Sequence, residues 1–420
     1  MDAQAPPAPA RARTHKLRSS FVSQDIESYP LRFAGSGGEY FRVWIVNVLL
    51  SIVTLGLYTP WARRRTAQYF YGQTLVAGSP LEFTAQQRRM VFGFAVLLLL
   101  TVAYQIAANT GQDMAVGLLI LSGAALAPLI WGSAMRFRLA NTRWRGLRLQ
   151  FAASWREVYL ASWPVFALAL TWVATVFALQ MLAPAPAVDE DTGRKLPQIS
   201  AAIWSLLALA LALSLLCLIR LEYNYRSLLV RRAFIGDEPG RWKPRFMDFV
   251  WLWLATVLVF VVSLVALVAL LALVFGGSFA LLRSLGADQP GIGMVIAIVL
   301  GTLLLGVGLL LVSAPARAYR EAALFRLTWS NIGVSRLARF KCNLGIGAFV
   351  LLRLRNMLLT LLTLGLFRPF AMVSEYRMKL ESVTLHVKGG VDHMAGRLVQ
   401  QQPGGIGDAL ADAVGLDLIG

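Results

Sequence analysis

The chain has 420 residues, of which 57% are hydrophobic and only 15% are charged, and its formal net charge is +18. Soluble globular domains carry about 25% charged residues, so this composition excludes an ordinary soluble protein and indicates a polytopic membrane protein. The basic residues are spread over many loops, a distribution that argues against nucleic acid as a partner. Cys217 and Cys342 lie far apart and form neither a disulfide framework nor a metal motif.

The two ends of the chain differ in composition from the rest. Residues 1–28 are rich in alanine, proline and basic side chains and lack an apolar stretch of signal-peptide length. We expect a disordered basic tail there and no cleaved targeting signal. Residues 404–420 are acidic and glycine-rich, and this second tail either frays or contacts the basic loops.

Six apolar runs have roughly the 20 residues that a helix needs to cross a bilayer. They are Met90–Ala108, Met114–Met135, Val158–Leu182, Ile199–Ile219, Phe249–Phe275 and Ile292–Val312. Basic residues are concentrated in alternate connections between these runs. There are six in Arg136–Glu157, seven in Arg220–Asp248 and six in Arg317–Asn343. The other three connections, which join the first run to the second, the third to the fourth and the fifth to the sixth, hold only three in total. Because basic loops stay in the cytoplasm, the runs form three hairpins and both chain termini are cytoplasmic.

Two shorter apolar segments, Val43–Tyr58 and Leu344–Phe367, have basic residues on both sides. If the three hairpins begin and end inside, each short segment also enters and leaves on the inside, as a re-entrant or interfacial helix does. The alternative is that both segments span, which gives eight crossing helices and weakly violates the charge bias.

The two short segments contain one repeated element, 309 positions apart. Asn47 is followed after six residues by TLGLYTPWA, and Asn356 is followed after six residues by TLGLFRPFA. Glycine permits close backbone approach and proline stops a helix, so the element predicts a backbone irregularity. The candidate polar and hinge positions are Asn47, Thr54, Gly56, Pro60, Asn356, Thr363, Gly365 and Pro369.

Side chains of this element allow two interpretations. An asparagine in an apolar segment either hydrogen-bonds between helices or lines a polar path. The basic and aromatic residues beside the irregularity suit an interfacial belt and an anchor for anionic lipid. These candidate lipid-facing residues are Trp61, Arg63, Arg64, Arg65 and Arg368.

A second repetition joins two places where the chain enters the membrane. The stretch from Phe33 to Glu39 recurs 118 positions later as Phe151 to Glu157, so that Glu39 and Glu157 are equivalent. The simpler role for each carboxylate is to pair with an arginine or to favour the start of a helix. We infer three degenerate repeats over residues 29–148 (short helix and first hairpin), 149–337 (second and third hairpins) and 338–403 (short helix and β element). The alternative to a functional role is that these repeats encode fold symmetry only.

Short β elements are predicted beside the helices. Residues 73–84 indicate two strands around a Gly-Ser-Pro turn, and residues 382–387 alternate like a strand. The expected fold is therefore mainly α: a polytopic helical membrane protein with about six long spanning helices in three hairpins. It also has two short helices and small cytoplasmic β elements.

These features together resemble the YjgN-like family of bacterial inner-membrane proteins. The resemblance covers residues 31–410, although the middle repeat of this chain lacks a TLG element. The residues that carry it are Phe33–Tyr40, Asn47, Thr54–Arg63, Tyr69–Gly72, Asn141–Leu147, Phe151–Tyr159 and Thr363–Ala371. It implies a multi-pass protein of the bacterial inner membrane and supplies no substrate.

No arrangement typical of an enzyme is present in the sequence. His15, His386 and His393 lack metal-ligand spacing, and the glycine-rich stretch 35–38 is not followed by a phosphate-binding motif. We expect no catalytic residue, cofactor, metal or nucleic-acid partner. The expected partners are the lipid bilayer, anionic lipids and an unidentified protein.

Two hypotheses for function follow. The first is a non-enzymatic membrane protein with a transport-like or pore-like core, since paired broken helices mark substrate sites in transporters. The second is a structural or adaptor protein that binds anionic lipid or a membrane partner at its basic cytoplasmic face.

Overall fold

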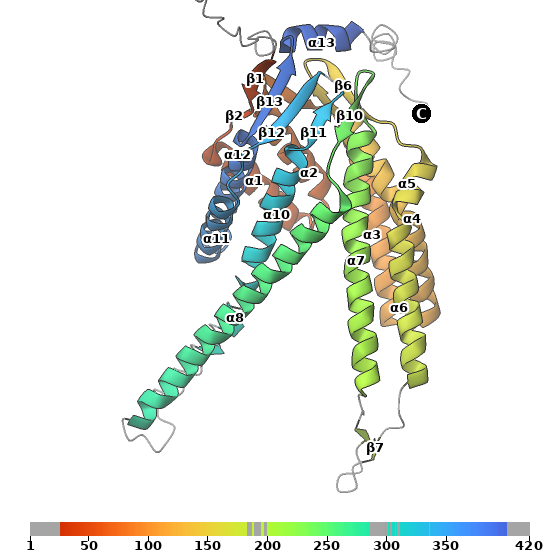
Figure 1. Cartoon of the computed structure of the whole chain (residues 1–420), viewed down its shortest axis with the longest axis vertical. Helices are drawn as coiled ribbons and strands as arrows, with labels where there is room; N and C mark the ends of the chain where they lie inside the picture. Colours follow the sequence, from red (N-terminus) through yellow and green to blue (C-terminus); the bar gives the residue numbers. More distant parts are fainter. Residues whose placement is uncertain are drawn as a thin grey trace, which may run out of the picture.

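The computed structural model describes residues 26–182, 187–188, 195–196, 200–284, 299, 301–302, 305–306, 308, 311–335 and 337–400. Over these residues the chain is mostly helical, as predicted, and it also forms one sheet of 11 strands. The long helices extend from one side of this sheet, and the two-stranded β7–β8 ribbon (Ala187–Val188, Lys195–Leu196) lies at the far end (Figure 1).

The sheet is closed into a barrel-like ring by the N-terminal segment. Its strand order is β1-β13-β12-β11-β10-β9-β6-β5-β4-β3-β2, and a single residue, Leu31, separates β1 from β2. The two ends of the order are therefore joined covalently. The strands are β1 (Ile26–Pro30), β2 (Arg32–Phe33), β3 (Thr74–Val76), β4 (Ser79–Phe83), β5 (Thr142–Trp144), β6 (Leu147–Phe151), β9 (Ala233–Ile235), β10 (Glu238–Trp242), β11 (Ile332–Val334), β12 (Ala338–Cys342) and β13 (Val383–Lys388).

The interior of the ring is packed with apolar side chains. Leu147, Val383 and Val387 are fully buried there. Helix α13 (Val391–Gln400) lies across the end of the ring away from the long helices (Figure 1) and adds Val391 and Leu398 to the same core. The ring is thus a solid cap, because alternate residues of each strand point inward.

Helices leave the ring in pairs and return to it. The pairs are α1 (Gly37–Val53) with α2 (Thr59–Gly72), α3 (Gln87–Asn109) with α4 (Asp113–Ala140), α5 (Trp155–Ala161) and α6 (Trp163–Leu182) with α7 (Ala201–Arg231), α8 (Phe246–Ser284) with α10 (Ala314–Trp329), and α11 (Ile346–Leu362) with α12 (Arg368–Glu381).

Strand pairing fixes where each helix pair begins and ends. We call the chain between two strands that contains a helix pair an excursion. The last strand residue before each described excursion pairs in the sheet with the first strand residue after it. These partners are Phe33 with Thr74, Phe83 with Thr142, Phe151 with Ala233, Trp242 with Ile332, and Cys342 with Val383. Every described excursion therefore starts and finishes on the same side of the ring. The predicted repeats 29–148, 149–337 and 338–403 hold two, two and one of these excursions, and their equivalence stays a prediction.

Four helices of the described chain are long and apolar enough to cross a membrane: Gln87–Asn109, Trp163–Leu182, Ala201–Arg231 and Phe246–Leu273. The predicted run Met114–Met135 lies within α4. The predicted run Val158–Leu182 is interrupted, since α5 ends at Ala161 and α6 begins at Trp163. Most of Ile292–Val312 lies outside the described residues, so a count of about six spans stays a prediction.

The predicted β elements are present but form a larger structure than expected. Strands β3 and β4 lie within residues 73–84, and β13 begins one residue after the predicted start at 382. These strands belong to one ring because they also pair with strands that are distant in the sequence. The local pattern of residues does not reveal such pairing. Residues 26–28 of the predicted basic tail form the start of β1; residues 1–25 and 404–420 lie outside the described residues.

Candidate functional site

The twin element forms the tips of two helical hairpins. In the first hairpin, Leu55 and Gly56 have φ values of +49° and +88°, and in the second, Leu364 and Gly365 have +49° and +96°. An α-helix cannot continue through left-handed backbone, so α1 and α11 end here and the chain turns back. The predicted irregularity is thus a reversal of direction.

A threonine side chain fastens each turn. The Thr54 hydroxyl donates to the Leu50 carbonyl at 2.7 Å and accepts from the Tyr58 amide at 3.0 Å. Thr363 makes the equivalent contacts at 2.7 and 2.9 Å. The buried prolines Pro60 and Pro369 lie in the first turn of α2 and α12, where proline is favoured. They start the second helix of each hairpin, whereas the sequence interpretation had them stop the first.

The two asparagines brace their own hairpins. The Nδ2 atom of Asn47 donates to the Ala62 carbonyl at 3.4 Å, and Asn356 donates to the Ala371 carbonyl at 3.4 Å. Both side chains are buried, and each Oδ1 atom lacks a hydrogen-bond partner within the described chain. This geometry corresponds to the structural role considered for them, since each bond joins the two helices of one hairpin.

The hairpin tips expose apolar side chains. Leu55 is 93% exposed and Leu364 is 95% exposed. Contiguous exposed apolar surface marks a contact with membrane or protein. Trp61, Arg63, Arg65 and Arg368 are exposed near these tips, whereas Arg64 is half-buried.

The first and last hairpins pack against each other. The rings of Phe41 and Phe370 are 5.8 Å apart, and Arg377 donates to the Gly35 carbonyl at 2.6 Å. A Cβ atom at Gly37 would lie only 2.5 Å from the Phe370 ring. The contact between the first and last hairpins therefore closes the circle of helices, at the place where the N-terminal segment closes the ring of strands.

The equivalent carboxylates Glu39 and Glu157 form capping boxes. The Ser36 hydroxyl accepts from the Glu39 amide at 3.2 Å, and the Glu39 carboxylate accepts from the Ser36 amide at 3.1 Å. Ser154 and Glu157 repeat the arrangement at 3.3 and 2.9 Å. These bonds satisfy two backbone donors at each helix start, which is the simpler of the roles considered for both residues.

Neighbouring groups hold these carboxylates in place. The Ser154 amide, and then the paired Arg232, keep the pKa of Glu157 below its usual value. Burial, assisted by the Glu39 charge, raises the pKa of Tyr69 to about 12. Tyr69 therefore stays protonated and donates to the Ser36 carbonyl at 2.8 Å.

A charged cluster that the sequence interpretation missed lies where α7, α8 and α10 meet. The Glu222 carboxylate accepts from Arg320 at 2.8 Å, from the Trp253 indole at 3.0 Å and from Arg226 at 3.4 Å. The Glu222 side chain is only 14% exposed. The Arg320 guanidinium lies 4.2 Å from the centre of the Trp253 ring. In the sequence, Glu222 is one of four acidic residues in the basic connection Arg220–Asp248, and its local sequence does not distinguish it from the others.

A second cluster joins α10 to the last hairpin. Glu321 accepts from Lys379 at 2.6 Å and pairs with Arg353, and Arg353 lies 4.0 Å from Glu375. Burial lowers the pKa of Lys379. Because Arg320 and Glu321 are consecutive, α10 links the two clusters. In the sequence, Arg353 is only an interruption of an apolar segment.

An apolar groove of about 600 Å³ runs between α8, α10 and α11. Its lining is apolar apart from one tyrosine and consists of Val259, Pro315, Tyr319, Ile346, Gly347, Val350, Leu351 and Leu354. Tyr319 and Leu354 stand two and one positions from Glu321 and Arg353 in the sequence. The groove therefore lies close to the second charged cluster.

Comparison with known proteins agrees with the membrane character of the chain. It is 28% identical to inner membrane protein YjgN of Escherichia coli O157:H7 over 153 residues, which is 36% of this chain and 38% of that protein. It is 28% identical to inner membrane protein YjgN of Salmonella typhimurium over 164 residues, which is 38% of this chain and 40% of that protein. The chain thus spans about two fifths of the length of these curated relatives.

No solved structure matches the chain. The family model described as bacterial protein of unknown function (DUF898) matches residues 28–413, which include the ring and both hairpin tips. The chain therefore belongs to the DUF898 family, the YjgN-like inner-membrane proteins.

Proposed function

We propose that this protein is a non-enzymatic, transport-like protein that takes the acyl part of a bilayer lipid into the groove between α8, α10 and α11. The observation that carries the proposal is the groove itself, which is about 600 Å³ in volume and almost wholly apolar. Apolar grooves of this size suit the hydrocarbon part of a ligand.

The position of the groove supports a lipid cargo. One wall belongs to α8, which is apolar enough to cross a bilayer, and another belongs to α11, whose hairpin returns to the ring. Acyl chains of the surrounding bilayer would reach such a groove directly from the side. The Glu321–Arg353 pair beside it offers polar contacts for a headgroup, and ionisable groups near the membrane commonly mark substrate paths.

The packed ring favours a lateral path over an axial pore. Leu147, Val383 and Val387 fill the ring and α13 covers its end. A cargo moving along the groove would avoid this core. We further propose that the ring faces the cytoplasm, because the basic connections lead into its strands, and that the exposed tip residues Leu55 and Leu364 insert into the inner leaflet.

Groove filling tests the proposal. A Cβ atom at Gly347 would meet no atom within 4 Å, so Gly347→Trp can occupy the groove without a backbone clash. The matched control is Leu358→Trp, at a half-exposed position of the same helix outside the groove lining. The protein is reconstituted with a photoactivatable phosphatidylethanolamine, and cross-links are mapped by mass spectrometry.

We expect cross-links at Val350 and Leu351, their loss in Gly347→Trp, and their retention in Leu358→Trp. Movement of a fluorescent phosphatidylethanolamine between leaflets, followed by dithionite quenching, tests transport and should be impaired in the same variant. Cross-links that persist in Gly347→Trp would refute the groove as the site. Cross-linking without leaflet exchange by the wild-type protein would refute transport.

A further inference from the structure

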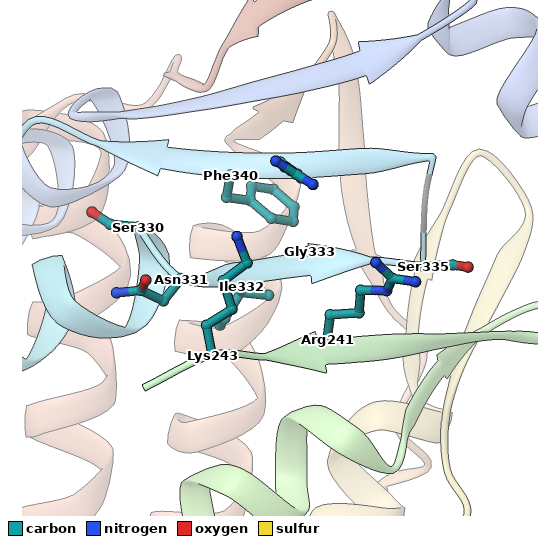
Figure 2. A pocket seen from close by; sticks show the side chains of 9 residues that line it. Arg241, Lys243, Ser330, Asn331, Ile332, Gly333, Ser335 and Phe340 are labelled. Carbon is teal, nitrogen blue, oxygen red and sulfur yellow. The ribbon is translucent and has the colours of Figure 1, made fainter. Parts of the chain in front are cut away.

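A cationic cleft lies on the outer face of the ring, over strands β10, β11 and β12. Its lining includes three basic side chains, Arg241, Lys243 and Arg339, together with the polar residues Ser330 and Asn331. Figure 2 shows Lys243 extending from β10 across β11 towards β12, and Arg241 extending from β10 as far as β11. The cleft belongs to the sheet and is separate in its lining from the apolar groove.

Strand register brings the two arginines together. Arg241 and Arg339 are both sheet partners of Gly333, on opposite sides of β11. Neighbouring strands are about 4.8 Å apart, so their Cα atoms lie about 10 Å apart on one face. Gly333 has no side chain to fill the space between them. A ligand a few ångströms wide can therefore be contacted by both guanidinium groups.

The basic groups of the cleft lack acidic partners. In the part of the chain that the structure describes, Arg241, Lys243 and Arg339 take part in no ion pair, although charged residues elsewhere do, such as Arg145 with Asp392. Three like charges that converge without a counter-charge repel one another. A bound anion would relieve this repulsion.

The size and donor chemistry of the cleft select the anion. Its volume is about 40 Å³, enough for a few water molecules at about 10–15 Å³ each, and therefore for one tetrahedral oxyanion. Guanidinium groups bind phosphate oxygens in bidentate fashion, and lysine adds a point charge. We propose that this cleft binds a phosphoryl group, carried either by a lipid headgroup or by free phosphate.

The proposal extends beyond lipid uptake by the groove and does not depend on it. The test is isothermal titration of the full chain in maltoside detergent with two probes, inorganic phosphate and dihexanoyl phosphatidic acid below its micellar concentration. The cleft variant is Arg241→Gln/Arg339→Gln. The control is Arg32→Gln/Lys388→Gln, which removes two exposed strand charges from the same ring and lies outside the cleft.

We expect at least one probe to bind the wild-type protein and its affinity to fall about tenfold or more in the cleft variant. The control variant should stay close to wild type. Binding of inorganic phosphate supports the free-oxyanion form, and binding of phosphatidic acid alone supports the headgroup form. The proposal is overturned if neither probe binds, or if both double variants lose affinity equally. Retained thermal stability of the cleft variant establishes that it is folded.

Discussion

The Asn356 amide nitrogen lies 3.1 Å from the Glu375 carboxylate, across the two helices of the last hairpin. Glu375 also lies beside Arg353, so Asn356 belongs to the charged network that reaches α10. In the first hairpin the position equivalent to Glu375 is Thr66. The twin elements therefore share their turn geometry and differ in what they are connected to.

This difference predicts unequal costs for the same substitution. Asn356→Leu removes the contact with Glu375 and the 2.9 Å contact with Ser374, whereas Asn47→Leu removes one long bond to Ala62. Membrane hydrogen bonds contribute about 0.6 kcal/mol on average and up to about 1.7. We expect Asn356→Leu to lower the free energy of unfolding by about 1–2 kcal/mol more than Asn47→Leu. Thermal unfolding of both variants in one detergent measures the gap, and equal losses would contradict the account.

Close packing between the first and last hairpins predicts sensitivity at Gly37. Its Cβ atom would overlap the Phe370 ring, whereas a Cβ atom at the neighbouring Gly38 would meet nothing within 4 Å. Gly37→Ala should therefore destabilise the protein by about 1–3 kcal/mol, while Gly38→Ala should be neutral or stabilising by about 0.5–1 kcal/mol. Urea unfolding in detergent compares the two. Partial rescue of Gly37→Ala by Phe370→Leu would locate the strain, and similar behaviour of both glycine variants would speak against the contact.

The capping box at α5 predicts a loss of stability on Ser154→Ala. Removal of a serine N-cap costs about 1 kcal/mol, because the Glu157 amide then lacks its acceptor. Unfolding of Ser154→Ala beside Ser205→Ala, whose hydroxyl bonds within its own helix, measures the effect. A cost no greater than that of the control would exclude a capping contribution.

Glu157 adds a pH dependence of known sign. The Ser154 amide and Arg232 hold its pKa below the ordinary value of 4.5, so the folded state favours the charged form. The resulting stability is fully present above the unfolded-state pKa and is lost as the pH falls through the lower folded-state pKa. Glu157→Gln should therefore be less stable than wild type at pH 7, and this gap should shrink in acid. A gap that is constant from neutral to acid pH would contradict the assignment.

Strand pairing of Phe33 with Thr74 predicts that the first hairpin returns to the side from which it started. Single-cysteine variants of a protein with Cys217 and Cys342 replaced by alanine test this prediction. A thiol at Ala67 should react with a membrane-impermeant maleimide from the same side as one at Glu27. A thiol at Leu55 should be protected in vesicles and react in detergent. Labelling of Ala67 and Glu27 from opposite sides would establish that the segment spans.

Local features of the fold could be predicted from sequence. The paired TLG elements and the two strands within residues 73–84 each depend on a few neighbouring residues, and the helix break at Gly56 follows from its backbone freedom. The predicted Gly-Ser-Pro turn was misplaced, because the chain turns at Ala77 and Gly78 and β4 begins at Ser79. The ring could not be predicted. Its strands are as short as two residues, as in Arg32–Phe33, which is too short for periodicity to distinguish a strand from a loop.

The long-range ion pairs could not be predicted from the sequence for a related reason. Arg320 and Glu222 stand 98 positions apart and Arg353 and Glu321 stand 32 apart. Charge counting assigned these residues to basic connections or to an interrupted apolar run, because it reads each segment by itself. The charged clusters exist only after α7, α10 and α11 have been brought together.

Closure of the ring also constrains the order of events during synthesis. Ile26 pairs with Lys388, so β1 has to wait for its partner β13 to be synthesised. Until β13 has been made, residues 26–30 cannot take up their pairing, and the sheet remains open at that edge. The helix pairs can insert one after another, but the ring closes only after Val383–Lys388 has been synthesised and can pair with β1.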